Sequence, residues 1–181
     1  RLQPPSTEHW FGTDQFGRDV FSRVAAGLAN SALISLVAVA FATVVGSVAG
    51  SVAGFYRVAS DGVISGVTND LFAFPPLLLA LSLASVFERN WFTIAIAIAI
   101  VYVPIFIRVT RGPVLSLREI EFVKAATSSG QRRSQILARH VVPNITSIIG
   151  VQITLSLSWA VLTEASLSFL GLGTPPPAPS L

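Results

Sequence analysis

The sequence has 181 residues, of which 52% are hydrophobic and only 12% are charged, with a formal net charge of +3 and no cysteine. Soluble domains carry about 25% charged residues, so this composition excludes an ordinary soluble domain. It predicts an all-α polytopic membrane protein, because several charge-free runs approach the roughly 20 residues that cross a bilayer. The absence of cysteine excludes a disulfide framework, a thiolate metal site and a catalytic thiol.

The N-terminal 19 residues are polar and rich in Pro and Gly, which predicts a loop. A short amphipathic helix is expected over residues 19–28, followed by a first membrane span over residues 29–54. Small side chains recur at every fourth position of this span, at Ala38, Ala42, Gly46, Gly50 and Gly54. Such a stripe lets a second helix approach closely, so we predict a helix-packing face.

Three further spans are expected, over residues 63–87, 91–107 and 145–163. The prolines at 75 and 76 lack backbone N–H donors, so they should kink or divide the second span. Asp70 lies inside that span, where a charge costs about 2.5–3.5 kcal/mol if it is centred in lipid. It should therefore face protein or water.

Residues 108–140 hold seven Lys or Arg against two acidic residues. The positive-inside rule places this segment in the cytoplasm. With four spans, the turn at 56–62 is then also cytoplasmic, and residues 88–90 lie outside. Because the positive charge follows the expected topology, we do not expect a nucleic-acid partner.

The chain thus divides into three parts. They are an extracytoplasmic segment with its approach helix (1–28), a transmembrane domain (29–165) with a cytoplasmic loop (108–142), and a Gly/Pro-rich outer loop (166–181). A tail left outside predicts at least one further span, so we expect the chain to be part of a longer subunit.

The cytoplasmic loop has a helical pattern. Ser116 and Glu119 form an S-x-x-E capping signature, which predicts a helix over residues 117–129, and Gly130 suits the left-handed position that ends a helix. A second helix is expected over 132–142, with Pro143 opening the next span. Such a hairpin either anchors the loop at the membrane surface or fits into the groove of a partner protein.

Residues 121–130, EFVKAATSSG, and residues 136–144, ILARHVVPN, resemble the EAA loop of ATP-binding-cassette importer permeases. Gly130 and Pro143 fall at the spacing of that family's pattern, whereas Lys124 stands where the family usually has Glu. The resemblance implies contact with an ATPase subunit through the 117–142 loop, at Glu121, Lys124, Ala125, Ala126, Gly130, Arg132 and Ile136.

A second set of motifs narrows the resemblance to the second permease subunit of the dipeptide and oligopeptide permease family. Residues 9–23, HWFGTDQFGRDVFSR, are similar to that family's LGTDxxGRDxxSR signature, and residues 72–80, 139–144 and 164–173 match further runs. The extracytoplasmic signature residues are Gly12, Thr13, Asp14, Gly17, Arg18 and Asp19. Asp14, Arg18 and Asp19 are equally suited to a local salt-bridge cluster that orders the outer loop.

The resemblance implies a multi-pass permease of the inner membrane with the type I importer fold and six spans, about four of them in this chain. A second homologous permease would complete the path through the lipid bilayer, and an extracytoplasmic binding protein would deliver the peptide. ATP and Mg would be bound by partner ATPase subunits, since this chain has no G-x-x-x-x-G-K-[ST] motif. No catalytic or metal site is expected in the chain itself.

Three residues are candidates for the translocation path: Asp70, Trp159 and Glu164. An ionisable side chain in a membrane segment is a functional candidate, although structural pairing explains Asp70 and Glu164 as well. Alternative functions are a secondary transporter or channel that uses Asp70, a nickel or glutathione importer of the same family, and a scaffold that anchors a soluble partner.

Overall fold

The computed structural model describes residues 2–56, 59–86 and 90–173, and these residues fold almost entirely into helices, as the composition predicts. The helices are α1 (Val20–Tyr56), α2 (Ala59–Phe72), α3 (Pro76–Val86), α4 (Trp91–Leu117), α5 (Glu121–Ser128), α6 (Arg133–Ile136) and α7 (Val142–Phe169), and a π-helical turn, Leu137–Val141, joins α6 to α7. Three helical stretches, Val20–Tyr56, Trp91–Leu117 and Arg133–Phe169, are long and apolar enough to cross a membrane, and α2 with α3 makes a fourth if this bent pair is one span.

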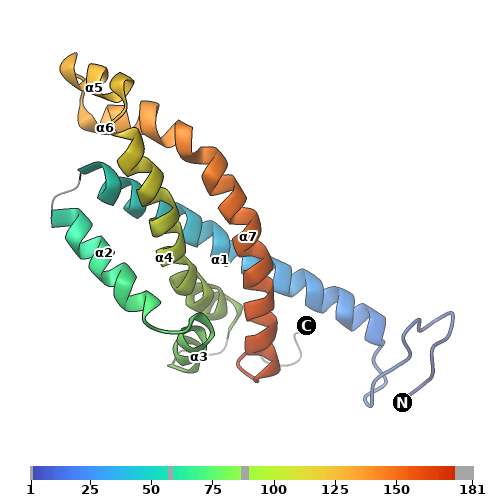
Figure 1. Cartoon of the computed structure of the whole chain (residues 1–181). Coiled ribbons are helices and arrows are strands. Elements are labelled where there is room, and N and C mark those ends of the chain that lie inside the picture. The colour runs from blue at the N-terminus through green and yellow to red at the C-terminus, as the bar shows by residue number, and fades with distance from the viewer. Residues whose placement is uncertain (1, 57–58, 87–89, 174–181) are drawn as a thin grey trace.

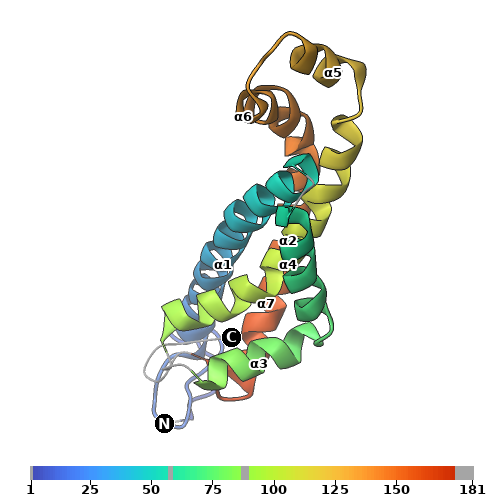
Figure 2. The ribbon, with the colours of Figure 1, turned by 90° about the vertical axis from the view of Figure 1, so that its left-hand side faces the viewer.

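Helices α4 and α7 run side by side along the bundle, and α1 crosses them at an incline (Figure 1). Helices α5 and α6 stand beyond one end of the bundle, whereas α3 lies at the opposite end (Figure 2). The N-terminal segment and the described end of the chain at residue 173 lie at the α3 end as well. The basic segment is therefore separated from both ends of the described chain, at residues 2 and 173, by the length of the bundle.

The stripe of small residues on α1 packs against α4, which confirms the predicted packing face. Ala38, Ala42, Gly46, Gly50 and Gly54 are all buried. A Cβ atom at Gly46 would lie 2.7 Å from the carbonyl oxygen of Val103, and one at Gly54 would lie 2.9 Å from that of Arg111. The two backbones therefore touch over more than two helical turns, and only glycine fits between them.

The first membrane helix is longer than predicted. The expected approach helix (19–28) and first span (29–54) are one continuous helix, since nothing in the apolar sequence after Val20 interrupts backbone hydrogen bonding. At about 55 Å, for 37 residues at 1.5 Å each, α1 exceeds the hydrocarbon core, which is about 30 Å thick. Its inclined path accommodates part of this length.

The second predicted span is divided rather than kinked. Helix α2 ends at Phe72 and α3 starts at Pro76, and the two axes differ by 93°. Pro75 and Pro76 cause the break, because neither can donate a backbone hydrogen bond to the preceding turn. Helix α3 therefore runs almost at a right angle to α2.

Helix α4 continues ten residues beyond the predicted end of the third span and includes both Pro104 and Pro113. Arginines in its last turns hold the neighbouring elements. Arg111 makes a bidentate ion pair with Asp61 of α2, at 2.7 and 2.9 Å, and the guanidinium of Arg118 donates to the carbonyl oxygen of Phe55 at 2.9 Å. Helix α4 is thus the element to which α1 and α2 are tied at the basic end.

The fourth predicted span (145–163) is the middle of a longer helical path from Arg133 to Phe169. The π-helical turn lies just before Pro143, where a regular helix would lose a hydrogen bond and place the proline ring against a carbonyl group. The side-chain amide of Asn144 donates to the carbonyl oxygen of His140 at 2.6 Å. Residues 166–169, predicted as outer loop, are helical, and residues 57–58, 88–89 and 174–181 of the predicted turns and loops lie outside the described residues.

Candidate functional site

The basic hairpin (residues 118–141) forms a helix, a corner and a second helix at one end of the bundle. Its first helix starts at Glu121 and not at residue 117 as predicted. Ser116 lies in the last turn of α4, and Ile120 occupies the N-cap position of α5 without a side-chain hydrogen bond. The S-x-x-E pattern was therefore wrong as a capping signature, because the preceding helix continues through it.

The corner confirms the prediction for Gly130. Its φ is +76°, in the left-handed region that favours glycine. The N–H of Gly130 donates to the carbonyl oxygen of Thr127, and the N–H of Gln131 donates to that of Ala126. These two bonds form a Schellman motif, which satisfies the free carbonyl groups at the end of α5.

The hairpin is tied to the bundle by a small apolar core. Val123, Ala126 and Ile136 are buried with residues from the ends of α1, α4 and α7, among them Phe55 and Val114. Ala126 and Ile136 were predicted to contact an ATPase subunit, and the structure instead directs both side chains inward. Their role is to hold the hairpin in position.

The other predicted contact residues, Glu121, Lys124, Ala125, Gly130 and Arg132, are exposed. The Lys124 ammonium lies 3.7 Å from a carboxylate oxygen of Glu119, and more than half of each side chain is exposed. An exposed pair of this kind contributes little stability, and the Lys124 ammonium remains accessible to solvent. Phe122, which is 44% exposed, adds an apolar side chain to this surface that the sequence analysis missed.

A hollow of about 450 Å³ lies beside α5. Its lining consists of Phe55, Arg118, Glu119, Val123, Lys124, Thr127, Ser128 and Arg133. Three of these residues are cationic and one is anionic, which gives the hollow a positive balance. The hollow lies beside the projecting corner at Gly130. A projection next to a recess is a shape suited to docking with another protein.

A second hollow, of about 490 Å³, opens between α3, α4 and α7. It is mainly apolar and is lined by Pro76, Leu77, Val101, Tyr102, Ile105, Gln152, Ser156, Trp159, Leu162, Thr163 and Ser166. Two polar contacts lie in its wall: the Tyr102 hydroxyl of α4 lies 3.4 Å from that of Thr163 on α7, and within α7 the Gln152 amide donates to Ser156 at 3.0 Å. Trp159, predicted for the path, is 64% exposed at this hollow.

The two acidic candidates do not join Trp159. Asp70 is exposed on α2, and at 100° per residue it lies on the face opposite to Asp61, Ser65 and Thr68, which face α4. Glu164 is fully buried and lies outside the lining of the hollow. The three residues predicted to share a path therefore occupy three separate environments in this structure.

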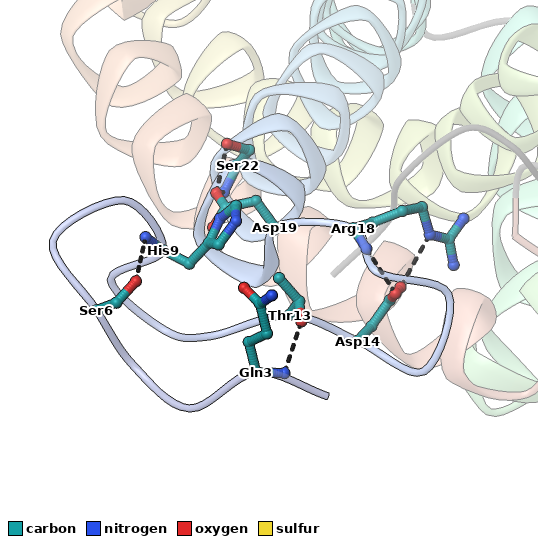
Figure 3. A network of polar contacts seen from close by, with 8 residues as sticks. All are labelled: Gln3, Ser6, His9, Thr13, Asp14, Arg18, Asp19 and Ser22. Atoms are coloured by element: carbon teal, nitrogen blue, oxygen red, sulfur yellow. Dashed lines mark hydrogen bonds and ion pairs between the residues drawn. The ribbon is translucent and has the colours of Figure 1, made fainter. Parts of the chain in front are cut away.

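The N-terminal loop (residues 2–19) brings together four of the signature residues, Thr13, Asp14, Arg18 and Asp19 (Figure 3). Thr13 pairs with Asp19 in an isolated antiparallel bridge, and its hydroxyl accepts from the backbone N–H of Gln3 at 2.8 Å. Gly12 and Gly17 have φ values of +71° and +81°. The positive φ of both glycines explains why the tight turns of this segment contain glycine.

Two carboxylates organise this loop. Asp14 accepts from the backbone N–H groups of Phe16 and Arg18 and forms an ion pair with the Arg18 guanidinium at 2.8 Å. The Asp19 carboxylate accepts hydrogen bonds from the N–H and the hydroxyl of Ser22, and in this way Asp19 caps the start of α1. The same carboxylate lies 3.1 Å from Nδ1 of His9. The predicted salt bridge is thus present between Asp14 and Arg18, whereas Asp19 pairs with His9, a residue that the sequence analysis missed.

These hydrogen bonds favour the ionised carboxylates. The backbone N–H of Arg18 is the main cause that lowers the pKa of Asp14, and the Ser22 hydroxyl is the main cause that lowers the pKa of Asp19. The loop is therefore held by negative charges at two turns. Among the described residues, no three His, Asp or Glu side chains are grouped to hold a metal ion.

Known proteins resemble this chain over most of its length. The profile of the family described as binding-protein-dependent transport system inner membrane component matches residues 42–181. A dipeptide transport system permease protein of Alkalihalophilus pseudofirmus is 44% identical over 179 residues, which cover 99% of this chain and 59% of that protein. An oligopeptide transport system permease protein of Bacillus subtilis is 39% identical over 178 residues, covering 98% and 58% respectively.

A glutathione transport system permease protein of Pectobacterium atrosepticum is 37% identical over 175 residues, which cover 97% of this chain and 58% of that protein. The chain therefore spans about three fifths of the length of these relatives.

Proposed function

The chain belongs to the family of binding-protein-dependent transport system inner membrane components, and we propose that it is the second permease subunit of an ATP-driven peptide importer. Dipeptide and oligopeptide permeases among its relatives support the peptide cargo. Glutathione, itself a peptide, is the alternative that a further relative favours. In this proposal a second, homologous permease completes the path, and an extracytoplasmic binding protein delivers the cargo.

The observation that carries the proposal is the basic hairpin. Its corner projects from one end of the bundle, its exposed residues include Glu121, Lys124 and Arg132, and its buried residues tie it to the ends of α1, α4 and α7. A partner that moves the corner would therefore move the long helices as well. We infer that the hairpin lies in the cytoplasm and docks on an ATPase subunit, which binds the ATP and Mg.

The hollow between α3, α4 and α7 supports a path on that side of the bundle. It is apolar, with a few polar groups and an exposed indole at Trp159, as expected of a surface that contacts a peptide without holding it tightly. Asp70 lies on a different exposed face, and a charge there is costly unless protein or water covers it. We propose that this face of α2 also lies toward the path or the second permease.

Variants at the corner test the coupling. Gly130→Val forces a β-branched residue into a left-handed conformation that costs about 1–2 kcal/mol for L-residues, so the full transporter should hydrolyse ATP with less peptide uptake per ATP. Gly130→Asn is the matched control, since Asn tolerates this conformation, and it should keep more of the coupling. Equal uptake per ATP in both variants and the wild type would argue against the hairpin as the coupling element.

A further inference from the structure

Glu164 is the most unusual side chain of the described core. It is fully buried in α7, and neither of its carboxyl oxygens has a hydrogen-bond partner within residues 2–56, 59–86 and 90–173. The hydroxyls of Ser31 and Ser35 on α1 are also fully buried and without a partner. Buried polar groups are nearly always hydrogen-bonded, so three such groups in one region require an explanation.

Ser31 and Glu164 lie where α1 meets α7, and Ser35 follows Ser31 by about one turn of α1. Ser31 and Ser35 are four residues apart and therefore share a face of α1. Glu164 lies between Ala160 and Leu167 on α7, and both of these belong to the apolar core that also contains Ile34 of α1. The Ser31 hydroxyl lies beside the Glu164 carboxyl group, so the acid points across the helix contact.

Three hydroxyls of the bundle, one each on α2, α3 and α7, behave differently, whereas those of Thr43 and Ser47 on α1 are also buried without a partner among the described residues. Thr68, Ser82 and Ser166 each donate to the carbonyl oxygen of the residue four positions earlier, which is the usual solution for Ser and Thr in a helix. Ser31 and Ser35 make no such bond. Their hydroxyls remain available for a partner on α7.

No cationic side chain among the described residues is paired with Glu164. The titratable side chain that α4 contributes to this core is Tyr102, whose hydroxyl faces Thr163. An isolated buried carboxylate is very unfavourable in a low-dielectric interior. A neutral carboxyl group has one donor and spare acceptor capacity, which matches two serine hydroxyls.

We propose that Glu164 carries a proton and forms, with Ser31 and Ser35, a hydrogen-bonded cluster that fixes α7 against the outer half of α1. The carboxyl O–H donates to one serine hydroxyl, and the other serine donates to the carbonyl oxygen. One helical stretch, Arg133–Phe169, leads from the basic hairpin into α7. The cluster therefore fixes the end of α7 that lies far from the hairpin. Glu164 is therefore a positioning residue, and this role does not depend on the cargo.

Infrared spectroscopy of the full-length subunit in its assembly tests the protonation directly. The wild type at neutral pH should show the carbonyl stretching band of a buried carboxylic acid, and Glu164→Gln should remove that band. Asp70→Asn is the matched control at the other acid of the membrane helices and should leave the band unchanged. Absence of the band in the wild type, or its loss in Asp70→Asn alone, would overturn the proposal.

Substitutions test the hydrogen bonding. Glu164→Gln keeps a donor and an acceptor and should retain the thermal midpoint and the uptake rate within about twofold. Glu164→Leu has a similar volume but leaves both serines unpaired, so it should lower the midpoint by about 2–12 °C, and Ser31→Ala with Ser35→Ala should lower it similarly. A Glu164→Leu protein as stable and active as the wild type would overturn the cluster, whereas loss of peptide uptake with an unchanged band and midpoint would bear only on the proposed function.

Discussion

Replacement of Gly50 by alanine should separate α1 from α4. The added Cβ would lie 2.5 Å from the carbonyl oxygen of Ile107 and 3.0 Å from its Cα, whereas an ordinary contact is 3.4–4 Å. The Thr110 hydroxyl oxygen also lies in close contact, but the two Ile107 atoms belong to the backbone of α4, so no side-chain rotation relieves the whole overlap. The two helices must move apart by roughly the difference, about 0.9 Å, and the neighbouring close contacts at Gly46 and Gly54 weaken with them.

The expected cost follows from two opposing effects. Overpacking a well-packed core destabilises by about 1–3 kcal/mol, whereas the higher helix propensity of alanine returns about 1 kcal/mol. Gly150→Ala on α7 is the matched control, because nothing lies within 4 Å of a Cβ at that position, and it should gain the propensity term alone. Gly50→Ala should therefore be about 1–3 kcal/mol less stable than Gly150→Ala.

Denaturant unfolding of the full-length subunit in micelles, followed by tryptophan fluorescence, measures this difference. The comparison between the two alanine variants removes the propensity term and isolates the packing term. Equal stability of Gly50→Ala and Gly150→Ala would refute the close approach of α1 and α4.

Two further predictions concern the ion pairs. Arg111→Gln should lower the free energy of unfolding by about 1–3 kcal/mol, because it leaves the Asp61 carboxylate without its bidentate partner, and Asp61→Asn in the same protein should recover part of that loss. Arg132→Gln, at an exposed arginine, is the control and should change the free energy of unfolding by no more than about 0.5 kcal/mol. A loss there as large as that of Arg111→Gln would contradict the stabilising role of the Arg111–Asp61 ion pair. The lowered pKa of Asp14 predicts that the N-terminal loop is fully stabilised above the ordinary aspartate value of 3.8 and loosens as the pH falls through the lowered pKa. Amide hydrogen exchange of residues 12–19 as a function of pH measures this loosening. In Asp14→Asn these amides should exchange faster than in the wild type at neutral pH. Equal exchange rates in the two proteins would contradict the role of the Asp14 carboxylate.

The sequence was sufficient to predict features that depend on local chemistry. The small-residue stripe on α1, the break at Pro75 and Pro76, and the left-handed corner at Gly130 were all predicted correctly. Each follows from a steric property of one residue type, a missing side chain or a missing N–H donor, and needs no knowledge of distant contacts.

The errors share a different cause. The third membrane span was predicted to end at Ile107, where the apolar character ends, but the helix continues to Leu117 and passes through Ser116. Hydropathy reports the membrane boundary, not the helix boundary, and the capping signature at Ser116 was misread for that reason. Likewise, the π-helical turn before Pro143 joins two predicted helices into one path.

The candidate site shows what one sequence cannot specify. Exposed and buried members of the hairpin are interleaved, so its helical pattern alone did not separate Lys124 and Ala125 from the buried Ala126. Asp70 and Glu164 were both predicted from their charge, but the direction of each side chain depends on how α2 and α7 rotate against their neighbours. That rotation is a property of tertiary packing.

The central claim is that the basic hairpin is a cytoplasmic docking element for an ATPase subunit. The most direct measurement places a single cysteine at Arg132 in an otherwise cysteine-free full-length subunit and labels it with a membrane-impermeant reagent in vesicles of known orientation. A cysteine at Gln15, in the N-terminal loop, reports the opposite face. We predict labelling at position 132 from the cytoplasmic side alone, with protection when the ATPase subunits are bound, and labelling from the outer side or without protection would contradict the claim.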